Sequence, residues 1–177
     1  MKGAIAVEYV NRCIKFNLPD GRTLDLLFET LNKMVLWKQE ELYKSEGCGF
    51  LLGYRNCKTK NITISDITMP QGRDYRLRFF CKILDKIHFY SLKQSAKKNN
   101  HYMGVWHTHP QNIPIPSNVD WDEWSEILKK DRTGDKYAIF IIIGMQEFRI
   151  WVGDFDTRII VEIFESASKD GIYRKGV

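Results

Sequence analysis

Two histidines and an aspartate lie within fourteen residues of one another, as His107, His109 and Asp120. Side chains of extended backbone alternate between two faces, so His107 and His109 project to the same side if this segment is a strand. Three prolines restrict the backbone between His109 and Asp120, so a loop can return the carboxylate to the imidazoles with little conformational freedom lost. Two imidazoles and one carboxylate suit zinc, and three protein ligands leave a fourth position for water. The spacing therefore predicts a catalytic site with one zinc ion per chain.

Chance is the first alternative, because a single histidine is more often a surface or hydrogen-bonded residue than a ligand. Fixing five residue types in one window, at about 5% usage each, gives on the order of one chance match in ten thousand chains. His88 and His101 have no comparable neighbours and are predicted to lie on the surface or at the edge of the core. Cys48, in a short apolar run, is predicted to be packed core and not a nucleophile.

The elements that position these residues follow from periodicity and turn signals. Apolar residues at helical spacing predict helices over 31–44, with Thr30 as its cap, over 79–98 and over 121–130. Strands are predicted at 4–10, 23–28, 49–54, 61–69, 102–106, 137–143, 148–152 and 159–164, with a turn at 18–22. Hairpins and crossovers both occur in this order, which predicts one α/β domain with a mixed sheet over 1–177. Residues 1–23 would be an N-terminal strand region and 166–177 a polar tail.

Composition limits the class of protein. Apolar residues make up 44% and aromatic residues 13% of the chain, enough for a core and too much for a disordered or fibrous protein. The net charge is +5, but the basic residues are interleaved with acidic ones, so nucleic acid is not an expected partner. Four cysteines without C-x-x-C spacing predict reduced thiols and a cytoplasmic protein. Neither a signal peptide nor a membrane span is expected, because no apolar run is long enough.

The order His-x-His-Pro, six residues, Ser-x-x-Asp resembles the signature of the JAB/MPN (JAMM) metalloproteases, which include deubiquitinating isopeptidases. The resemblance implies the cytidine-deaminase-like sandwich of that family, a curved mixed β-sheet flanked by helices. In the family a glutamate just before a Gly-rich apolar strand is the general base, and the segment 46–53 resembles it, which assigns that role to Glu46. Ser117 resembles the serine that stabilises the oxyanion, although it could equally cap a helix.

Softer motifs at 66–70, 74–79 and 104–110 resemble the bacterial stand-alone JAB peptidases of antiphage operons, with type II CBASS systems nearest. The resemblance, which covers 24–164, implies cleavage of the amide bond between the C-terminus of a conjugated protein and its target. That protein would be a cGAS-like nucleotidyltransferase or a ubiquitin-like modifier. Two alternatives remain. A zinc amidase acting on a small molecule or short peptide would use the same chemistry, whereas a non-catalytic MPN scaffold usually lacks the ligands or the glutamate.

The densest basic cluster consists of Arg73, Arg76, Arg78 and Lys82. It could contact an acidic patch or the C-terminal tail of the modifier. Four basic residues in ten are not exceptional in a chain of this charge, so a solvated edge explains the cluster at least as well.

Overall fold

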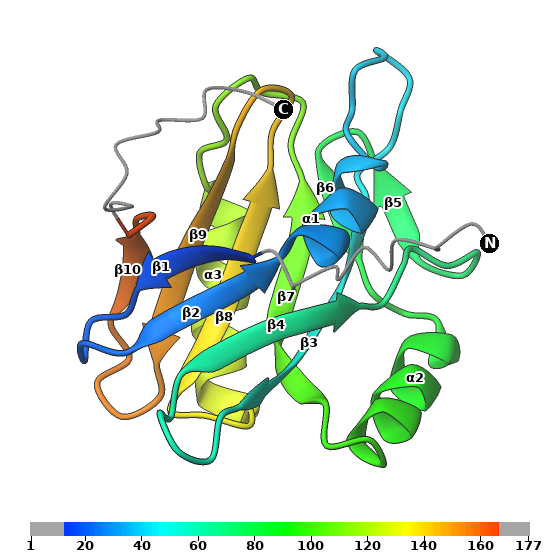
Figure 1. Ribbon diagram of the computed structural model, residues 1–177. Helices are drawn as coiled ribbons and strands as arrows, with labels where there is room; N and C mark the ends of the chain where they lie inside the picture. Colours follow the sequence, from blue (N-terminus) through cyan, green and yellow to red (C-terminus); the bar gives the residue numbers. More distant parts are fainter. Residues whose placement is uncertain (1–12, 167–177) are drawn as a thin grey trace, which may run out of the picture.

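A mixed sheet of eight strands forms the centre of the protein (Figure 1), whose computed structural model describes residues 13–166. The strand order is β1-β2-β4-β3-β7-β8-β9-β10. Their bounds are β1 Cys13–Asn17, β2 Thr23–Leu27, β3 Cys48–Arg55, β4 Ile62–Ile67, β7 His101–Thr108, β8 Tyr137–Ile143, β9 Phe148–Asp154 and β10 Ile160–Ile163. Strand β2 pairs parallel with β4 and β7 parallel with β8, and the other pairs are antiparallel. The α/β fold with a mixed sheet, expected from the element order, is therefore confirmed.

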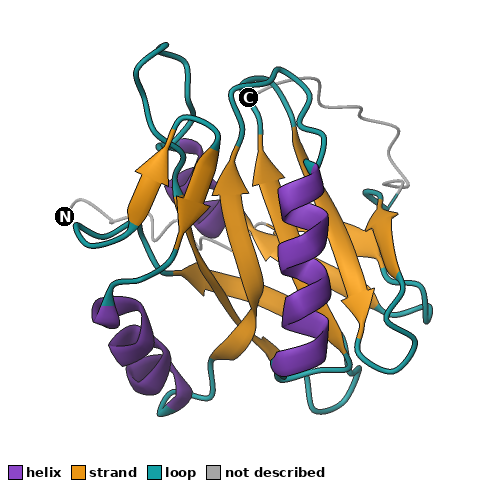
Figure 2. Cartoon of the chain, turned by 180° about the vertical axis from the view of Figure 1, so that it is seen from behind, coloured by secondary structure: helices purple, strands orange, loops and turns teal. Residues whose placement is uncertain are grey.

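Helices cover both faces of the sheet (Figures 1 and 2). Helix α1 (Phe28–Val35) packs against β4 and β2, and helix α3 (Asn118–Lys130) packs on the opposite face against β8 and β9. Strand β8 contributes alternate residues to the two resulting cores, so every residue of it is buried, as its uninterrupted apolar run predicts. Among the described residues, no helix is long and apolar enough to cross a membrane.

A short hairpin stands apart from the main sheet. It is formed by β5 (Tyr75–Leu77) and β6 (Phe80–Lys82), and helix α2 (Lys86–Ala96) follows it. His88 on α2 is fully buried, with Nε2 2.8 Å from Asp74 Oδ2 and Nδ1 2.6 Å from the Thr68 hydroxyl. The expectation that His88 lies on the surface or at the core edge is therefore wrong. This buried network instead fixes the start of the hairpin to β4 and α2.

The helix predicted over 31–44 is wrong at both ends, because α1 spans Phe28–Val35. Thr30 lies buried inside the helix, and its N-cap is Leu27, which makes no side-chain capping bond. Leu42 and Tyr43, which extend the apolar pattern, are 84% and 83% exposed. Neither side chain packs against another element, so burial does not stabilise a helix here. The segment 36–47 instead hydrogen-bonds to the β5–β6 hairpin.

The prediction of a helix over 79–98 is also wrong in its first part, because Phe80–Lys82 forms β6. Helix α2 begins only after Asp85, whose side chain accepts a hydrogen bond from the Ile87 amide. At the N-terminus, the strand expected at 4–10 lies outside the described residues. Strand β1 pairs with β2 across the predicted turn at 18–22, where Gly21 has the positive φ of 83° that the turn requires.

The cysteines differ from expectation, because Cys48 of β3 and Cys81 of β6 form a disulfide. Their Cα atoms are 6.3 Å apart, within the usual range for such a bond. Cys13 and Cys57 are free, as predicted. Spacing along the chain could not identify the pair, since the hairpin brings together two residues 33 positions apart.

Gly104 in β7 offers a test of the central pairing. Its φ is +142°, and an added Cβ would lie 1.9 Å from the carbonyl oxygen of Ile139 in β8. We expect Gly104→Ala to lower the free energy of unfolding by about 2–4 kcal/mol, measured by equilibrium urea denaturation. Gly72→Ala is the control, because a Cβ there meets nothing within 4 Å. Equal stability of the two variants would contradict this account of β7.

Candidate metal centre

The two histidines come from the end of the central strand β7. His107 is in the strand and His109 follows it directly, with the His109 amide still donating to Ile143 O at 2.9 Å. Their side chains share one face, with Nε2 atoms 3.1 Å apart, while Thr108 between them points the other way, toward Gln39. The same-face arrangement expected from strand geometry is observed.

Asp120 comes from the first turn of α3, where Ser117 is the N-cap. The Ser117 hydroxyl accepts a hydrogen bond from the Asp120 amide at 3.2 Å and donates to Asp120 Oδ2 at 2.7 Å. The Ser117 amide also donates to Oδ2, which completes a capping box. A carboxylate in the first turn is further favoured by the helix dipole. Helix capping therefore orients the third candidate ligand.

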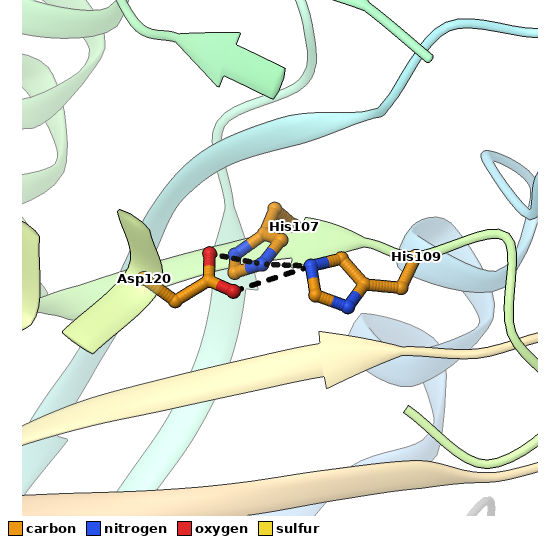
Figure 3. Close-up of side chains that lie close together, drawn as sticks. All are labelled: His107, His109 and Asp120. Carbon is orange, nitrogen blue, oxygen red and sulfur yellow. Dashed lines mark hydrogen bonds and ion pairs between the residues drawn. The ribbon is translucent and has the colours of Figure 1, made fainter. Parts of the chain in front are cut away.

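The three side chains converge on one point (Figure 3). His107 Nε2 lies 3.0 Å from Asp120 Oδ1, and His109 Nε2 lies 3.4 Å from Asp120 Oδ2. A tetrahedral ion with ligands about 2.0 Å from it has ligand atoms about 3.3 Å apart. The observed separations are close to that value, so the donor set fits a metal ion of the size and chemistry of zinc.

The pKa shifts of His107 and Asp120 favour the protonation states that bind metal ions. Burial lowers the pKa of His107, although the neighbouring Asp120 opposes this. Burial would raise the pKa of Asp120, but its hydrogen bonds with His107 and His109 outweigh burial and hold that pKa below its usual value. A neutral imidazole and an ionised carboxylate are the forms that ligate metal ions.

Glu46 lies in the same cleft as His107, Ser117 and Asp120, a space of about 380 Å³. Its side chain is almost fully buried. Burial, followed by repulsion from Asp120 and Glu123, raises the pKa of Glu46 to about 9. A cation bound nearby would favour the ionised carboxylate and lower that pKa.

The cleft runs between β6 and α3. One wall is formed by residues 79–83 and the other by side chains of α3, among them Val119, Glu123 and Ile127. Most of the lining is apolar, and Lys82 lies across from Glu123 closely enough to influence its pKa. The cleft is open to solvent.

The residues of the basic cluster make different contacts. Arg76 donates to Glu46 O at 3.2 Å and lies over the Trp37 ring, and Arg78 donates to the carbonyls of Glu41 and Leu42. Two of the four basic residues therefore bind the backbone of the segment that leads to Glu46, which neither sequence interpretation anticipated.

Sequence reasoning also missed Thr108 and Gln39, which are buried and hydrogen-bonded to the segment that carries Glu46. The position of Thr108 between two candidate ligands was the only available signal for it. Nothing in the sequence singles out Gln39, because its partners come from other parts of the chain.

Known proteins are similar to this chain in sequence and in fold. The family of prokaryotic homologs of the JAB domain matches residues 29–153. A "CD-NTase/cGAS isopeptidase" from Vibrio cholerae serotype O1 (strain ATCC 39315 / El Tor Inaba N16961) is 25% identical over 140 residues, which cover 76% of this chain and 83% of the relative. A protein of the same name from Pseudomonas aeruginosa (strain BWHPSA011 / Pa011) is 28% identical over 131 residues, covering 71% and 80%. The solution structure of protein DSY2949 from Desulfitobacterium hafniense aligns with a TM-score of 0.54 at 18% identity, covering 80% of this chain and 88% of that one, a likeness of fold.

The ligand set predicts the metal content of purified protein. Wild-type protein prepared without chelator should carry about one divalent metal ion per chain, and His107→Ala or Asp120→Ala should lose most of it. His101→Ala is the matched control, because His101 is an exposed histidine of the same strand. Inductively coupled plasma mass spectrometry gives the metal content, and circular dichroism shows whether the variants fold. Unchanged metal in both ligand variants would refute the site.

Proposed function

The chain belongs to the family of prokaryotic JAB domains, and on that premise we propose that it is a zinc-dependent isopeptidase with His107, His109 and Asp120 as ligands. It hydrolyses the amide bond between the C-terminus of a conjugated protein and its target. The observation that carries the proposal is the convergence of three ligand atoms within 4.8 Å of one another, in a cleft that also contains a buried glutamate.

When bound, zinc acts as a Lewis acid that polarises the scissile carbonyl and makes water a stronger nucleophile. Glu46 is the general base, which takes a proton from the attacking water and delivers it to the nitrogen of the leaving amine. Its burial supports this role, because burial raises the pKa of a carboxyl group and so makes its carboxylate a stronger base than one in water. The amine therefore leaves as a neutral molecule, and Glu46 returns to its ionised form once it has delivered the proton taken from water.

Ser117 is proposed to stabilise the oxyanion. Its hydroxyl borders the cleft, but in this structure it donates to Asp120 Oδ2. Donation to a substrate oxygen therefore requires the hydroxyl to rotate away from Asp120. The Ser117 amide also donates to Oδ2 and can hold the carboxylate while the hydroxyl turns.

The substrate class is inferred from the cleft and from the relatives. An open apolar channel between β6 and α3 suits the extended C-terminal tail of a protein better than a compact small molecule. The relatives named as CD-NTase/cGAS isopeptidases favour a cGAS-like nucleotidyltransferase over a ubiquitin-like modifier. A non-catalytic scaffold is disfavoured, since such a protein has no need to keep a glutamate buried next to a complete ligand set.

A substitution at Glu46 separates the general base from the ligands. Glu46→Gln should keep the metal and the fold but lose about two to four orders of magnitude in kcat, as expected for a missing general base. Glu162→Gln on β10 is the control and should retain wild-type activity. A Glu46→Gln enzyme that turns over at the wild-type rate would show that Glu46 has another role.

The substrate class can be tested with an amide-linked conjugate. A nucleotidyltransferase joined through its C-terminus to a lysine or a following peptide should be cut directly after its last residue, with mass spectrometry identifying the product. A short peptide copying the tail should be cut more slowly, because the folded protein contributes binding energy that positions the carbonyl. Phenanthroline should abolish both reactions. Cleavage that persists in chelator, or at an internal site, would contradict the proposal, and cutting of small amides alone would favour the amidase.

A further inference from the structure

The position of Glu46 depends on contacts outside its own segment, because residues 44–47 are in neither a helix nor a strand. The Glu46 amide donates to Leu77 O of the hairpin at 2.9 Å. The next amide, that of Gly47, donates to the Thr108 hydroxyl at 2.9 Å, and the Thr108 amide donates back to Gly47 O at 2.9 Å. The backbone of the proposed general base is thus held from both sides.

Thr108 connects the general base to the metal ligands. It is the residue between His107 and His109, and its side chain is completely buried on the opposite side of the strand. Its hydroxyl accepts from Gly47 and donates to Gln39 Oε1 at 3.0 Å, so both of these hydrogen bonds have a fixed direction. Any shift of the ligand strand is therefore passed to the peptide that follows Glu46.

Gln39 joins this hydroxyl to two further segments. Its Nε2 donates to Lys44 O at 3.0 Å and to Arg78 O at 2.7 Å, and the residue is only 1% exposed. One buried amide thus ties together β7, the segment that carries Glu46 and the β5–β6 hairpin. Hydrogen bonds shielded from water are not exchanged for bonds to solvent, so they restrict the segment more than surface contacts would.

We propose that Thr108 and Gln39 are positioning residues for Glu46, which hold its carboxylate at a set distance from the metal ligands. The proposal rests on the general-base role proposed for Glu46. Neither residue lines the cleft, so Thr108 acts through its bonds to Gly47, and Gln39 acts through the Thr108 hydroxyl and the carbonyl of Lys44. A displacement of about 1 Å in a catalytic group can reduce the rate about a hundredfold.

Thr108→Val tests this directly, since valine keeps the shape of threonine and removes the hydroxyl. We expect kcat to fall about 10- to 100-fold, with KM within about twofold and an unchanged metal content. Thr108→Ser restores the hydroxyl and should recover activity to within about threefold of wild type. A Thr108→Val enzyme with wild-type kcat would overturn the proposal.

Thr133→Val is the control. The Thr133 hydroxyl donates to Tyr137 O at 2.6 Å and so also ties a loop to a strand, but at the start of β8, whereas His107 lies beside Ile142 near the end of that strand. A purely structural role of Thr108 predicts similar losses of thermal stability and kcat in both valine variants. The positioning role predicts lost thermal stability in both and a large loss of kcat in Thr108→Val alone, and equal losses of kcat would contradict it.

A double variant separates action through Glu46 from any other effect. If Thr108 acts only by positioning Glu46, then Thr108→Val should cost nothing further in a Glu46→Gln background. Multiplied losses would refute the proposal. Gln39→Leu removes the hydrogen bonds of the Gln39 amide and should show the same loss of kcat, again with no further loss in a Glu46→Gln background. This variant provides the test if Thr108→Val does not fold.

A measurement independent of activity distinguishes this proposal from the proposed function. Hydrogen exchange of the Gly47 amide, followed by NMR, should accelerate at least tenfold in Thr108→Val and remain unchanged in Thr133→Val. Unchanged exchange in Thr108→Val would overturn the positioning role even in an active enzyme. Conversely, if wild-type protein cleaved no conjugate while exchange accelerated as expected, the substrate assignment would fail and the structural link to Glu46 would stand.

Discussion

Strand β7 is hydrogen-bonded along both edges, antiparallel to β3 and parallel to β8, and the proposed catalytic groups depend on that pairing. Its register sets His107 opposite Cys48 on one side and Ile142 on the other. Glu46 precedes Cys48 by two residues, so the strand that carries the candidate histidine ligands also determines where the proposed general base lies along the sheet. A strand in the middle of a sheet has little freedom to shift, which suits groups that must keep their distances.

The position of Asp120, the third candidate ligand, depends on how α3 packs. The indole of Trp124 stacks on Phe140 of β8, with ring centroids 4.6 Å apart and an angle of 10° between the rings. Leu128 extends the contact to the same core. This packing holds the N-terminus of α3 over the end of β7, where the capping box turns Asp120 toward the histidines. The contact between Trp124 and Phe140 thereby helps to hold Asp120 beside the two histidines at the end of β7.

Charge explains why the cleft suits a cation. Asp120, Glu123 and the buried Glu46 lie near one another, and the pKa values of both glutamates are raised by burial and then by their acidic neighbours. Ionising all three without a counter-charge would be costly. A dication bound there would offset that repulsion and leave Glu46 able to accept a proton. The β5–β6 hairpin also restricts the backbone around Glu46, through the Cys48–Cys81 disulfide and the hydrogen bonds of Arg76 and Leu77 to Glu46.

The sequence by itself determined the ligand pattern, the resemblance of Glu46 and Ser117 to family residues, and the elements with strong local periodicity. Strand β8 is an uninterrupted apolar run, and helix α3 has apolar residues at regular helical spacing. The residues of each segment were therefore sufficient to predict it. Tertiary structure decided the rest. The segment 36–47 has helical spacing but no surface to pack on, and it instead folds around Gln39, whose partner Arg78 lies 39 residues away. The burial of His88, the pairing of Cys48 with Cys81 and the contact of Thr108 with Gly47 also join distant segments, and local patterns in a sequence carry no information about such contacts.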